Sequence, residues 1–251
     1  MNDKILVALD VETRDEALAL ADALRGSVGG FKIGSRLFTA QGPSMVRTLV
    51  ERGDRVFLDL KFHDIPNTVA AAIAAAAELG VWMVNVHASG GMVMMQAARA
   101  AAHEAAAKRN VQPPLVIAVT VLTSMSPAAL RDTGIVIDLM DHVLRLAELT
   151  REAGLDGVVA SPRETALIRG RCGKDFAIVT PGIRGGPAAL RPGSGQAGAK
   201  DDQERTMSPA DAVAAGASYL VVGRPIIAAA DPREAAQRIA ESVADKAEGR
   251  R

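Results

Sequence analysis

Residues 56–68 read Val-Phe-Leu-Asp-Leu-Lys-Phe-His-Asp-Ile-Pro-Asn-Thr, and this stretch indicates how the rest of the chain folds. Its apolar first half is typical of a buried β-strand. Because side chains alternate along a strand, Asp59 and Lys61 are expected on the same side. Pro66 ends the extended run and can begin a helix, which the alanine-rich segment after it continues. The stretch therefore predicts charged side chains at the carboxyl end of a strand, just before a helix.

The same alternation of strand and helix runs through the whole chain. Strands are expected at residues 4–9, 30–33, 55–61, 81–87, 115–120, 157–160, 176–180 and 219–222. Helices are expected at residues 14–24, 44–50, 66–79, 91–108, 137–153, 162–169, 209–214 and 225–244. This order predicts an α/β fold, a (β/α)8 TIM barrel, as a single domain over residues 1–251. An open, doubly wound sheet is the alternative, but no Gly-x-Gly-x-x-Gly follows the first strand.

Composition limits the classes of function. The 251 residues have a formal net charge of zero, and only 3% are aromatic. No nucleic-acid partner is expected, because there is neither a basic excess nor a set of stacking platforms. No membrane span or signal peptide is expected either. A single cysteine, Cys172, expected in a polar turn, excludes an intramolecular disulfide and predicts a cytoplasmic protein.

Polar residues gather where the predicted strands end. They are Asp10, Lys32, Asp59, Lys61, His87, Thr123, Arg184 and Arg224. In a barrel these strand ends share one mouth, so the two acids and two lysines of the first three strands would form an alternating charge array. Such an array keeps aspartates ionised and lysines protonated in a partly dry site. The alternative is a set of ion pairs that serves only the stability of the barrel.

A phosphate site is predicted after the last strand, at Gly223-Arg224-Pro225. A glycine amide at the start of a helix, with an arginine beside it, suits a phosphate dianion. The loops after strands seven and eight are the usual phosphate site of a TIM barrel. The run could also be no more than a tight turn. Arg184, after the seventh strand, would add a second arginine on the same side.

No metal site is predicted. The chain has no His-x-x-x-His or Cys-x-x-Cys spacing. His103 and His142 lie within predicted helices, where a surface or core histidine is expected. His87 ends the fourth strand, where it could be a ligand or a histidine bonded to the backbone.

The longer string at residues 59–69, Asp-Leu-Lys-Phe-His-Asp-Ile-Pro-Asn-Thr-Val, resembles the signature of the orotidine 5′-phosphate decarboxylase family. Similar family motifs follow in the expected order: Asn85-Val86-His87-Ala88, Val121-Leu122-Thr123-Ser124, Thr180-Pro181-Gly182-Ile183-Arg184, Asp202-Gln203 and Gly223-Arg224-Pro225. The resemblance covers nearly the whole chain. It implies an enzyme of pyrimidine biosynthesis that converts orotidine 5′-phosphate to uridine 5′-monophosphate and carbon dioxide without a cofactor.

The resemblance also implies a role for each matching residue. Lys61 would stabilise a carbanion at carbon six of the pyrimidine and protonate it, with Asp59 against the substrate carboxylate. Asp64 would complete the catalytic set from the neighbouring subunit, so the enzyme would be a homodimer with shared active sites. The substrate-binding residues would be Asp10 and Lys32 at the ribose, Ile65 and Thr68 from the neighbouring subunit, Thr123 and Ser124 at the base, Arg184, Gln203, Gly223 and Arg224 at the phosphate, and Pro181.

One segment departs from the family pattern. Residues 185–200 are rich in Gly, Pro and Ala and make the expected phosphate lid longer than in the family, so its closed geometry is not predicted. A magnesium-dependent sugar-phosphate decarboxylase or aldolase also carries Asp-x-Lys-x-x-Asp and is the main alternative. The string after Lys61 favours the metal-free decarboxylase. A catalytically silent phosphate-binding barrel is a third possibility, which the presence of Asp59 and Lys61 disfavours.

Overall fold

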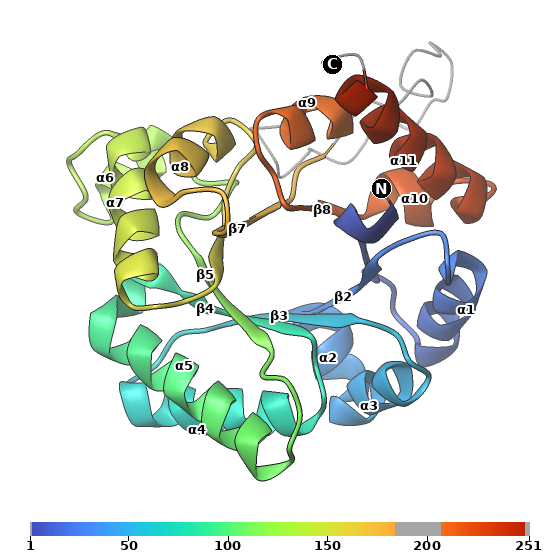
Figure 1. The fold of residues 1–251 in the computed structure, drawn as a ribbon, viewed down its shortest axis with the longest axis horizontal. Helices are drawn as coiled ribbons and strands as arrows, with labels where there is room; N and C mark the ends of the chain where they lie inside the picture. Colours follow the sequence, from blue (N-terminus) through green and yellow to red (C-terminus); the bar gives the residue numbers. More distant parts are fainter. Residues whose placement is uncertain (1, 184–206, 249–251) are drawn as a thin grey trace.

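The computed structural model describes residues 2–183 and 207–248. Within them, eight parallel strands close into a barrel in chain order, because β8 pairs with β1. Helices surround this barrel on the outside (Figure 1). The predicted (β/α)8 fold is confirmed, whereas the extent of one domain over residues 1–251 stays a prediction.

Each predicted strand is present, with ends that differ from the prediction by at most two residues. The strands are β1 (Ile5–Ala8), β2 (Gly30–Gly34), β3 (Val56–Phe62), β4 (Met83–His87), β5 (Leu115–Val119), β6 (Gly157–Val159), β7 (Ala177–Thr180) and β8 (Tyr219–Val222). Most of their residues are buried, as expected for parallel strands that are covered on both faces.

The helices follow the strands around the barrel. They are α1 (Arg14–Leu24), α2 (Ser35–Gln41), α3 (Pro43–Glu51), α4 (Pro66–Glu78), α5 (Gly91–Lys108), α6 (Pro127–Asp132), α7 (Leu139–Glu152), α8 (Thr165–Cys172), α9 (Pro209–Ala214), α10 (Arg224–Ile227) and α11 (Pro232–Glu248), with 3₁₀ turns η1 (Asn2–Lys4) and η2 (Ala88–Gly90). Helix α1 begins where predicted because Thr13 and Glu16 form a capping box. The Thr13 hydroxyl accepts the amide of Glu16 at 3.2 Å, and the Glu16 carboxylate accepts the amide of Thr13 at 3.1 Å.

Three local features differ from the sequence prediction. The short helices α2 and α6 were not predicted, because each buries only one residue, Leu37 or Leu130, and so shows no apolar periodicity. Helix α8 begins three residues later than predicted, after a turn in which the Glu164 carboxylate accepts the amide of Ser161 at 2.8 Å. Cys172 was wrongly placed in a polar turn. It is the last residue of α8 and is buried, and this burial raises the pKa of its thiol.

Two layers of apolar side chains flank the barrel wall. Alternate strand residues point inward and fill the barrel interior: Leu6, Ala8, Phe57, Met83, Ile117, Val179 and Val221. Their neighbours along each strand point outward and pack under the helices in the larger core. The inward series continues toward the carboxyl ends of the strands, where polar residues replace apolar ones. Asp59 follows Phe57, for example, and Asn85 follows Met83. The alternation of the strands therefore directs these polar side chains into one end of the barrel.

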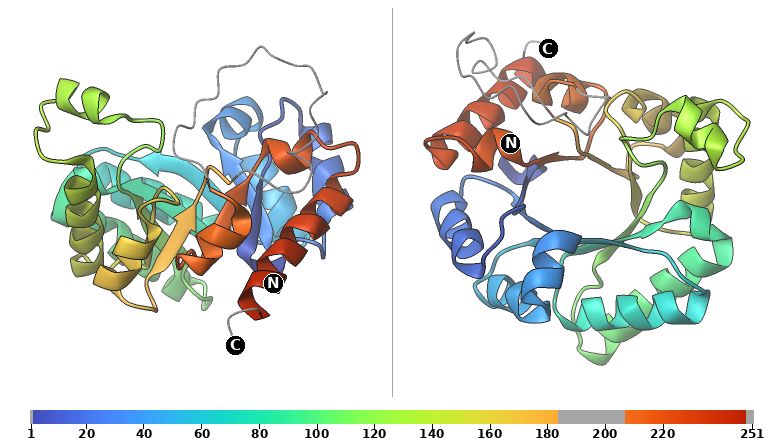
Figure 2. Two further views of the ribbon diagram at one scale, coloured as in Figure 1. Left: turned by 90° about the horizontal axis from the view of Figure 1, so that it is seen from above. Right: turned by 180° about the vertical axis from the view of Figure 1, so that it is seen from behind.

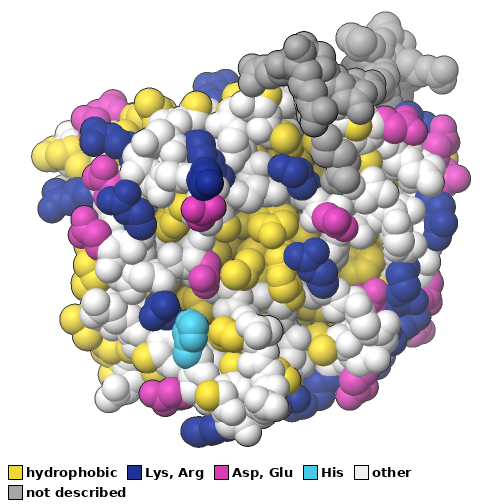
Figure 3. Space-filling model, in the orientation of Figure 1, with side chains coloured by type: hydrophobic (Ala, Val, Ile, Leu, Met, Phe, Trp, Pro, Cys, Tyr) yellow, Lys and Arg dark blue, Asp and Glu magenta, His cyan; other side chains and the backbone are white. Residues whose placement is uncertain are grey.

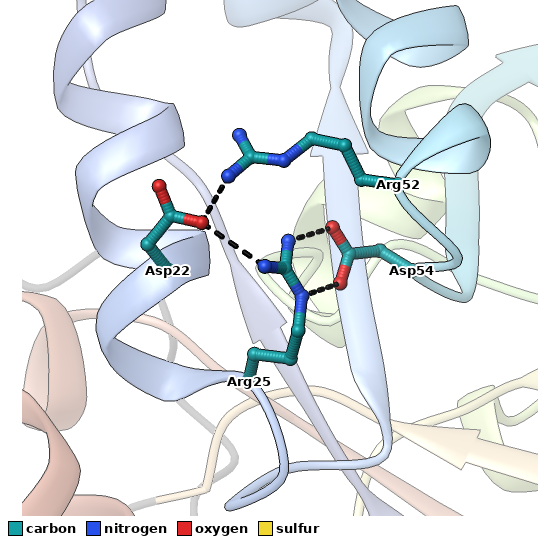
Figure 4. A network of polar contacts seen from close by, with 4 residues as sticks. All are labelled: Asp22, Arg25, Arg52 and Asp54. Carbon is teal, nitrogen blue, oxygen red and sulfur yellow. Dashed lines mark hydrogen bonds and ion pairs between the residues drawn. The ribbon is translucent and has the colours of Figure 1, made fainter.

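A network of four charged side chains ties α1 to the segment between α3 and β3 (Figure 4). Arg25 holds Asp54 with two hydrogen bonds, of 2.9 and 2.8 Å, and also pairs with Asp22 at 3.1 Å. Arg52 pairs with the same oxygen of Asp22. The hydrogen bond from Arg52 is the main cause that lowers the pKa of Asp22. Three of the four side chains are at least 30% exposed, so the network orients two helices but adds little stability.

The two ends of the barrel carry different segments of the chain. In the side view of Figure 2, the N-terminus lies at one end and α6, in the loop after β5, lies at the other. Figure 3 shows the side seen in Figure 1, where hydrophobic side chains lie in the middle and charges of both signs surround them.

At the amino ends of the strands, Arg55 stacks 3.9 Å over the ring of Trp82, which meets Tyr219 edge-on. No helix among the described residues is both long and apolar enough to cross a bilayer.

The close approach of β6 to β7 makes Gly157 sensitive to substitution. A β-carbon at this position would overlap the carbonyl oxygen of Ala177 and lie 2.6 Å from its Cβ. Gly157→Ala is therefore expected to destabilise the fold by about 1–3 kcal/mol, the range for overpacking. Gly170→Ala is the matched control, because position 170 lies inside α8 with no heavy atom within 4 Å. It is expected to be neutral or stabilising, since alanine is the better helix former. Thermal denaturation measures both, and equal melting temperatures would contradict this account.

Candidate active site

A cavity of about 550 Å³ opens among the carboxyl ends of the strands. Eight of the predicted site residues line it: Asp10, Lys32, Asp59, Lys61, Thr123, Pro181, Gly223 and Arg224. They come from the ends of β1, β2, β3, β5, β7 and β8. Residues that are more than 200 positions apart in the chain therefore meet at one mouth.

Four of these side chains form the alternating charge array. The ammonium of Lys32 lies 3.4 Å from an oxygen of Asp10 and 3.4 Å from Oδ2 of Asp59. The ammonium of Lys61 donates to Oδ1 of Asp59 at 2.7 Å. The two inner side chains, Lys32 and Asp59, are 10% and 13% exposed, whereas Asp10 is 52% exposed. The array therefore extends from solvent into a nearly dry interior.

Asp59 is ionised because its neighbours outweigh its burial. Burial alone would raise the pKa of this carboxyl. The charges of Lys32 and Lys61, with hydrogen bonds from Lys61 and Asn85, lower the pKa below its ordinary value of 3.8. Because the pKa of Asp59 is lower in the folded protein, its ionised form stabilises the fold at pH values above the ordinary pKa. This stabilisation is lost as the pH falls through the pKa of the folded state. Asp59 is therefore a fixed negative charge at neutral pH.

Gly34 makes room for the array. A β-carbon at this position would lie 2.9 Å from the ammonium of Lys32 and 3.6 Å from an oxygen of Asp10. A larger residue would displace the Lys32 head group from between its two carboxylates. The absence of a side chain at the end of β2 is thus part of the site.

The backbone of β3 is irregular where the array lies. Lys61 has a φ of 54°, in the left-handed region that a non-glycine residue occupies at a cost of roughly 1–2 kcal/mol. The pairing of β3 with β4 also shifts register between Leu58 and Phe62. The contact between Asp59 and Lys61 agrees with the prediction that they lie on the same side. Regular alternation of side chains along β3 does not produce this contact, however. A bulge re-aims the Lys61 side chain onto Asp59.

Apolar side chains form much of the remaining cavity wall. Phe57, Val119, Val159 and Val221 line it from inside the barrel, and Leu122 lies beside Thr123. Arg36 also lines the cavity and pairs with Glu12 at its rim. Sequence reasoning missed Arg36 because it lies in α2, the helix that shows no apolar periodicity. The signal that could have found it is its position two residues after Gly34 at the end of β2.

Some predicted site residues do not line this cavity. Asp64, Ile65, Thr68 and Ser124 are exposed, and Ile65 is 67% exposed. The Asp64 carboxylate accepts the amide of Ile65 at 2.6 Å. Two other predicted residues, Arg184 and Gln203, and the long 185–200 segment lie outside the described residues.

A pair of histidines lies next to the array. The rings of His63 and His87 are 5.5 Å apart. Burial is the main cause that lowers the pKa of His87 from its ordinary value of 6.5, and the nearby His63 and Lys61 lower it further. His87 is therefore mostly neutral at neutral pH. Its neutral form is the one that the fold favours, so stability is lost as the pH falls below 6.5.

The described residues contain no group of three or more His, Cys, Asp or Glu side chains that could hold a metal ion. The polar groups of the cavity instead alternate between carboxylates and ammonium groups. Such a site can hold a negative charge and a proton donor side by side, next to an apolar wall, in a cavity that Arg36 and Arg224 also line.

The chain is similar to known proteins over almost its full length. Residues 3–239 match the family model described as orotidine 5′-phosphate decarboxylase / HUMPS family. Orotidine 5′-phosphate decarboxylase of Moorella thermoacetica is 55% identical over 96% of this chain and 92% of its own length. The enzyme of the same name from Vibrio cholerae is 51% identical over 97% of this chain and 100% of its own length.

A solved structure agrees with this similarity. The crystal structure of orotidine 5′-phosphate decarboxylase from Lactobacillus acidophilus superposes with a TM-score of 0.81 at 34% identity, over 95% of this chain and 98% of that one. With its closed barrel, its charge array and these matches, the chain belongs to the orotidine 5′-phosphate decarboxylase / HUMPS family.

Proposed function

We propose that this protein decarboxylates orotidine 5′-phosphate to uridine 5′-monophosphate and carbon dioxide, in pyrimidine biosynthesis. The observation that carries the proposal is the array of Asp10, Lys32, Asp59 and Lys61 at the barrel mouth. The names of the relatives at 51–55% identity support it. A cytoplasmic location is part of the proposal and rests on the single cysteine.

The proposed chemistry uses the two residues at the inner end of the array. Asp59, kept ionised by its lysine neighbours, lies beside the substrate carboxylate, and the two negative charges repel. When the bond to the carboxylate breaks, carbon dioxide leaves and the electron pair stays on carbon six of the pyrimidine. The ammonium of Lys61 stabilises this carbanion and then gives it a proton, which Lys61 regains from solvent. In this proposal the positive charge of Lys61 stabilises the carbanion in place of an electron-sink cofactor, so the step needs no cofactor.

The remaining predicted site residues bind the substrate in this proposal. Asp10 and Lys32 hold the ribose hydroxyls, and Thr123 with Ser124 contacts the base. Gly223 and Arg224, together with Arg184 and Gln203, hold the phosphate, and Pro181 is a further substrate contact. The phosphate is remote from the reacting carbon, so its binding energy can order the site and close it around the substrate.

The protein is further proposed to be a homodimer with shared active sites. Asp64, Ile65 and Thr68 follow directly after the array in sequence but are exposed and lie outside the cavity of their own chain. Ile65 is 67% exposed in the single chain, and burial against a second subunit would remove this apolar surface from water. In a two-fold dimer each chain would give these residues to its partner's site.

A magnesium-dependent enzyme that acts on a sugar phosphate is the second candidate, because related enzymes also carry Asp-x-Lys-x-x-Asp. The first candidate is favoured by the string Phe-His-Asp-Ile-Pro-Asn after Lys61 and by the names of the relatives at 51–55% identity. The two candidates differ in their need for a metal, and this difference can be measured.

Lys61→Ala tests the proposed activity with orotidine 5′-phosphate in a spectrophotometric assay. The wild-type protein is expected to turn over this substrate. The variant is expected to lose at least about 10²–10⁴-fold in kcat, because a general acid contributes that much and a stabilising cation is lost with it. Lys108→Ala, an exposed lysine at the end of α5, is the control and should keep wild-type activity. A Lys61→Ala variant with more than about a tenth of wild-type kcat would contradict the assignment.

Removal of divalent metals tests the choice between the two candidates. Activity toward orotidine 5′-phosphate is expected to be unchanged after exhaustive treatment with EDTA, because Lys61 and Lys32 supply the positive charge. The assay is repeated after magnesium is added back. Loss of activity with EDTA and its return with magnesium would overturn the metal-free mechanism.

Mixed dimers test the shared site. Lys61→Ala and Asp64→Ala are each expected to be nearly inactive. When the two are unfolded and refolded together, about half the dimers are mixed, and one site of each mixed dimer has no substitution, so roughly a quarter of all sites recover. The control pair is Lys61→Ala with Asp59→Ala. Both residues serve their own chain's site, so this mixture should not recover. If the first mixture stays inactive although mass spectrometry shows subunit exchange, Asp64 does not act in the partner's site.

A further inference from the structure

Asn85 is a buried polar residue beside the charge array that the proposed reaction does not use. It lies in the middle of β4 and has no exposed surface. Its neighbours two positions away are Met83, which packs inside the barrel, and His87. By strand alternation Asn85 also points into the barrel, directly below the cavity. A fully buried amide must have hydrogen-bond partners, and these show what it does.

Both ends of the Asn85 amide bind the catalytic segment of β3. Its Nδ2 donates to Oδ1 of Asp59 at 2.7 Å. Its Oδ1 accepts the backbone amide of Lys61 at 2.8 Å. The orientation of the amide is fixed by its partners, because a carboxylate only accepts and a backbone N–H only donates. One side chain therefore holds two members of the array at once.

The irregular pairing of β3 explains why Lys61 needs this bond. Leu58 pairs with Val84 and Phe62 pairs with Val86, so four steps along β3 face only two steps along β4. Residues 59–61 therefore lie opposite Asn85 alone and have no regular partner on β4, although Asp59 still pairs with Gly34 of β2 on the other side. The backbone N–H of Lys61, which has no partner in the β3–β4 ladder, donates to the Asn85 side chain instead. Lys61 is also the residue with a φ of 54°. The bulge is thus closed by a side chain instead of a strand partner.

We infer that Asn85 is a positioning residue that holds Lys61 in its left-handed backbone conformation and fixes the Asp59 carboxylate between the two lysines. It does not touch the reacting atoms itself. This inference rests on the proposed function for its effect on rate, and on the two hydrogen bonds alone for its effect on geometry. A site that is misplaced by about 1 Å loses on the order of 100-fold in rate.

Asn85→Leu tests the inference by removing both hydrogen bonds at similar volume. It is expected to lower kcat about 100-fold, while KM changes by less than about threefold, because the defect lies at the reacting end of the site. Thr150→Val is the matched control. Thr150 is fully buried in α7 and donates to the carbonyl of Leu146 at 2.7 Å, so its loss disturbs a buried hydrogen bond away from the array. Its kcat should equal that of the wild type.

Asn85→Asp adds a second measurement, the pH dependence of kcat, which a change in packing alone would not alter. A protonated carboxyl at this position can donate to Asp59 and accept from the Lys61 amide, as the native amide does. Once it ionises, two carboxylates face each other and the bond to Asp59 is lost. Its kcat should therefore fall as the pH rises, over a range in which the wild type and Asn85→Leu show no such fall. The charged groups near position 85 are Asp59 and Lys61 on β3 and Lys32 on β2. His87 on β4 is a further titratable group, and β5 presents the uncharged Ile117. His87 is present in all three proteins, so any effect of its titration on kcat also appears in the wild-type pH profile and can be subtracted.

The outcomes decide the inference in each case. A kcat of Asn85→Leu within about threefold of wild type would overturn it. So would an Asn85→Asp profile parallel to that of the wild type, which also decides the matter if Asn85→Leu does not fold. A crystal structure of the folded variant is independent of any assay: Lys61 is expected to leave the left-handed region, and an unchanged Lys61 would overturn the inference. Inactive wild-type protein would instead contradict the proposed function, which keeps the two failures apart.

Discussion

The carboxylate of Asp59, held between the ammonium groups of Lys32 and Lys61, is the interaction on which the rest of the site depends. It is almost fully buried, and a lone carboxylate in that place would have to take up a proton. Its partners reverse this tendency, so that burial and ionisation occur together. Loss of either lysine would leave a buried charge with too little compensation. The geometry of β2, β3 and β4 can be understood as the support for this one charge.

That support includes several local departures from regular structure. Position 34 lacks a side chain, Lys61 adopts a backbone conformation that non-glycine residues avoid, and β3 slips out of register with β4. Each departure costs stability by itself. They persist because the closed barrel and its two apolar layers supply the opposing free energy. The site is therefore a small region of strain inside a regular frame.

Sequence reasoning reached the barrel because strand and helix periodicities are local properties, which eight repeats reinforce. It failed at α2 and α6, where burial of a single residue leaves no pattern. It also brought together the charged residues at the strand ends, because the carboxyl ends of parallel strands meet at one mouth. The bulge at Lys61 and the role of Asn85 could not be found this way. They depend on how two strands pair, and a side chain that replaces a strand partner has no signature in the sequence.

The order of the strands around the barrel has a consequence for synthesis. The charge array and its buried amide come from β1 to β4 and are complete once residue 85 has been made. Gly223 and Arg224, which also line the cavity, come from the last strand end, and the same strand β8 pairs with β1 to close the wall. A growing chain thus contains every member of the array before a sealed barrel exists to keep water from it. The ion pairs gain their full strength only late in synthesis, after β8 has been made and has closed the barrel wall.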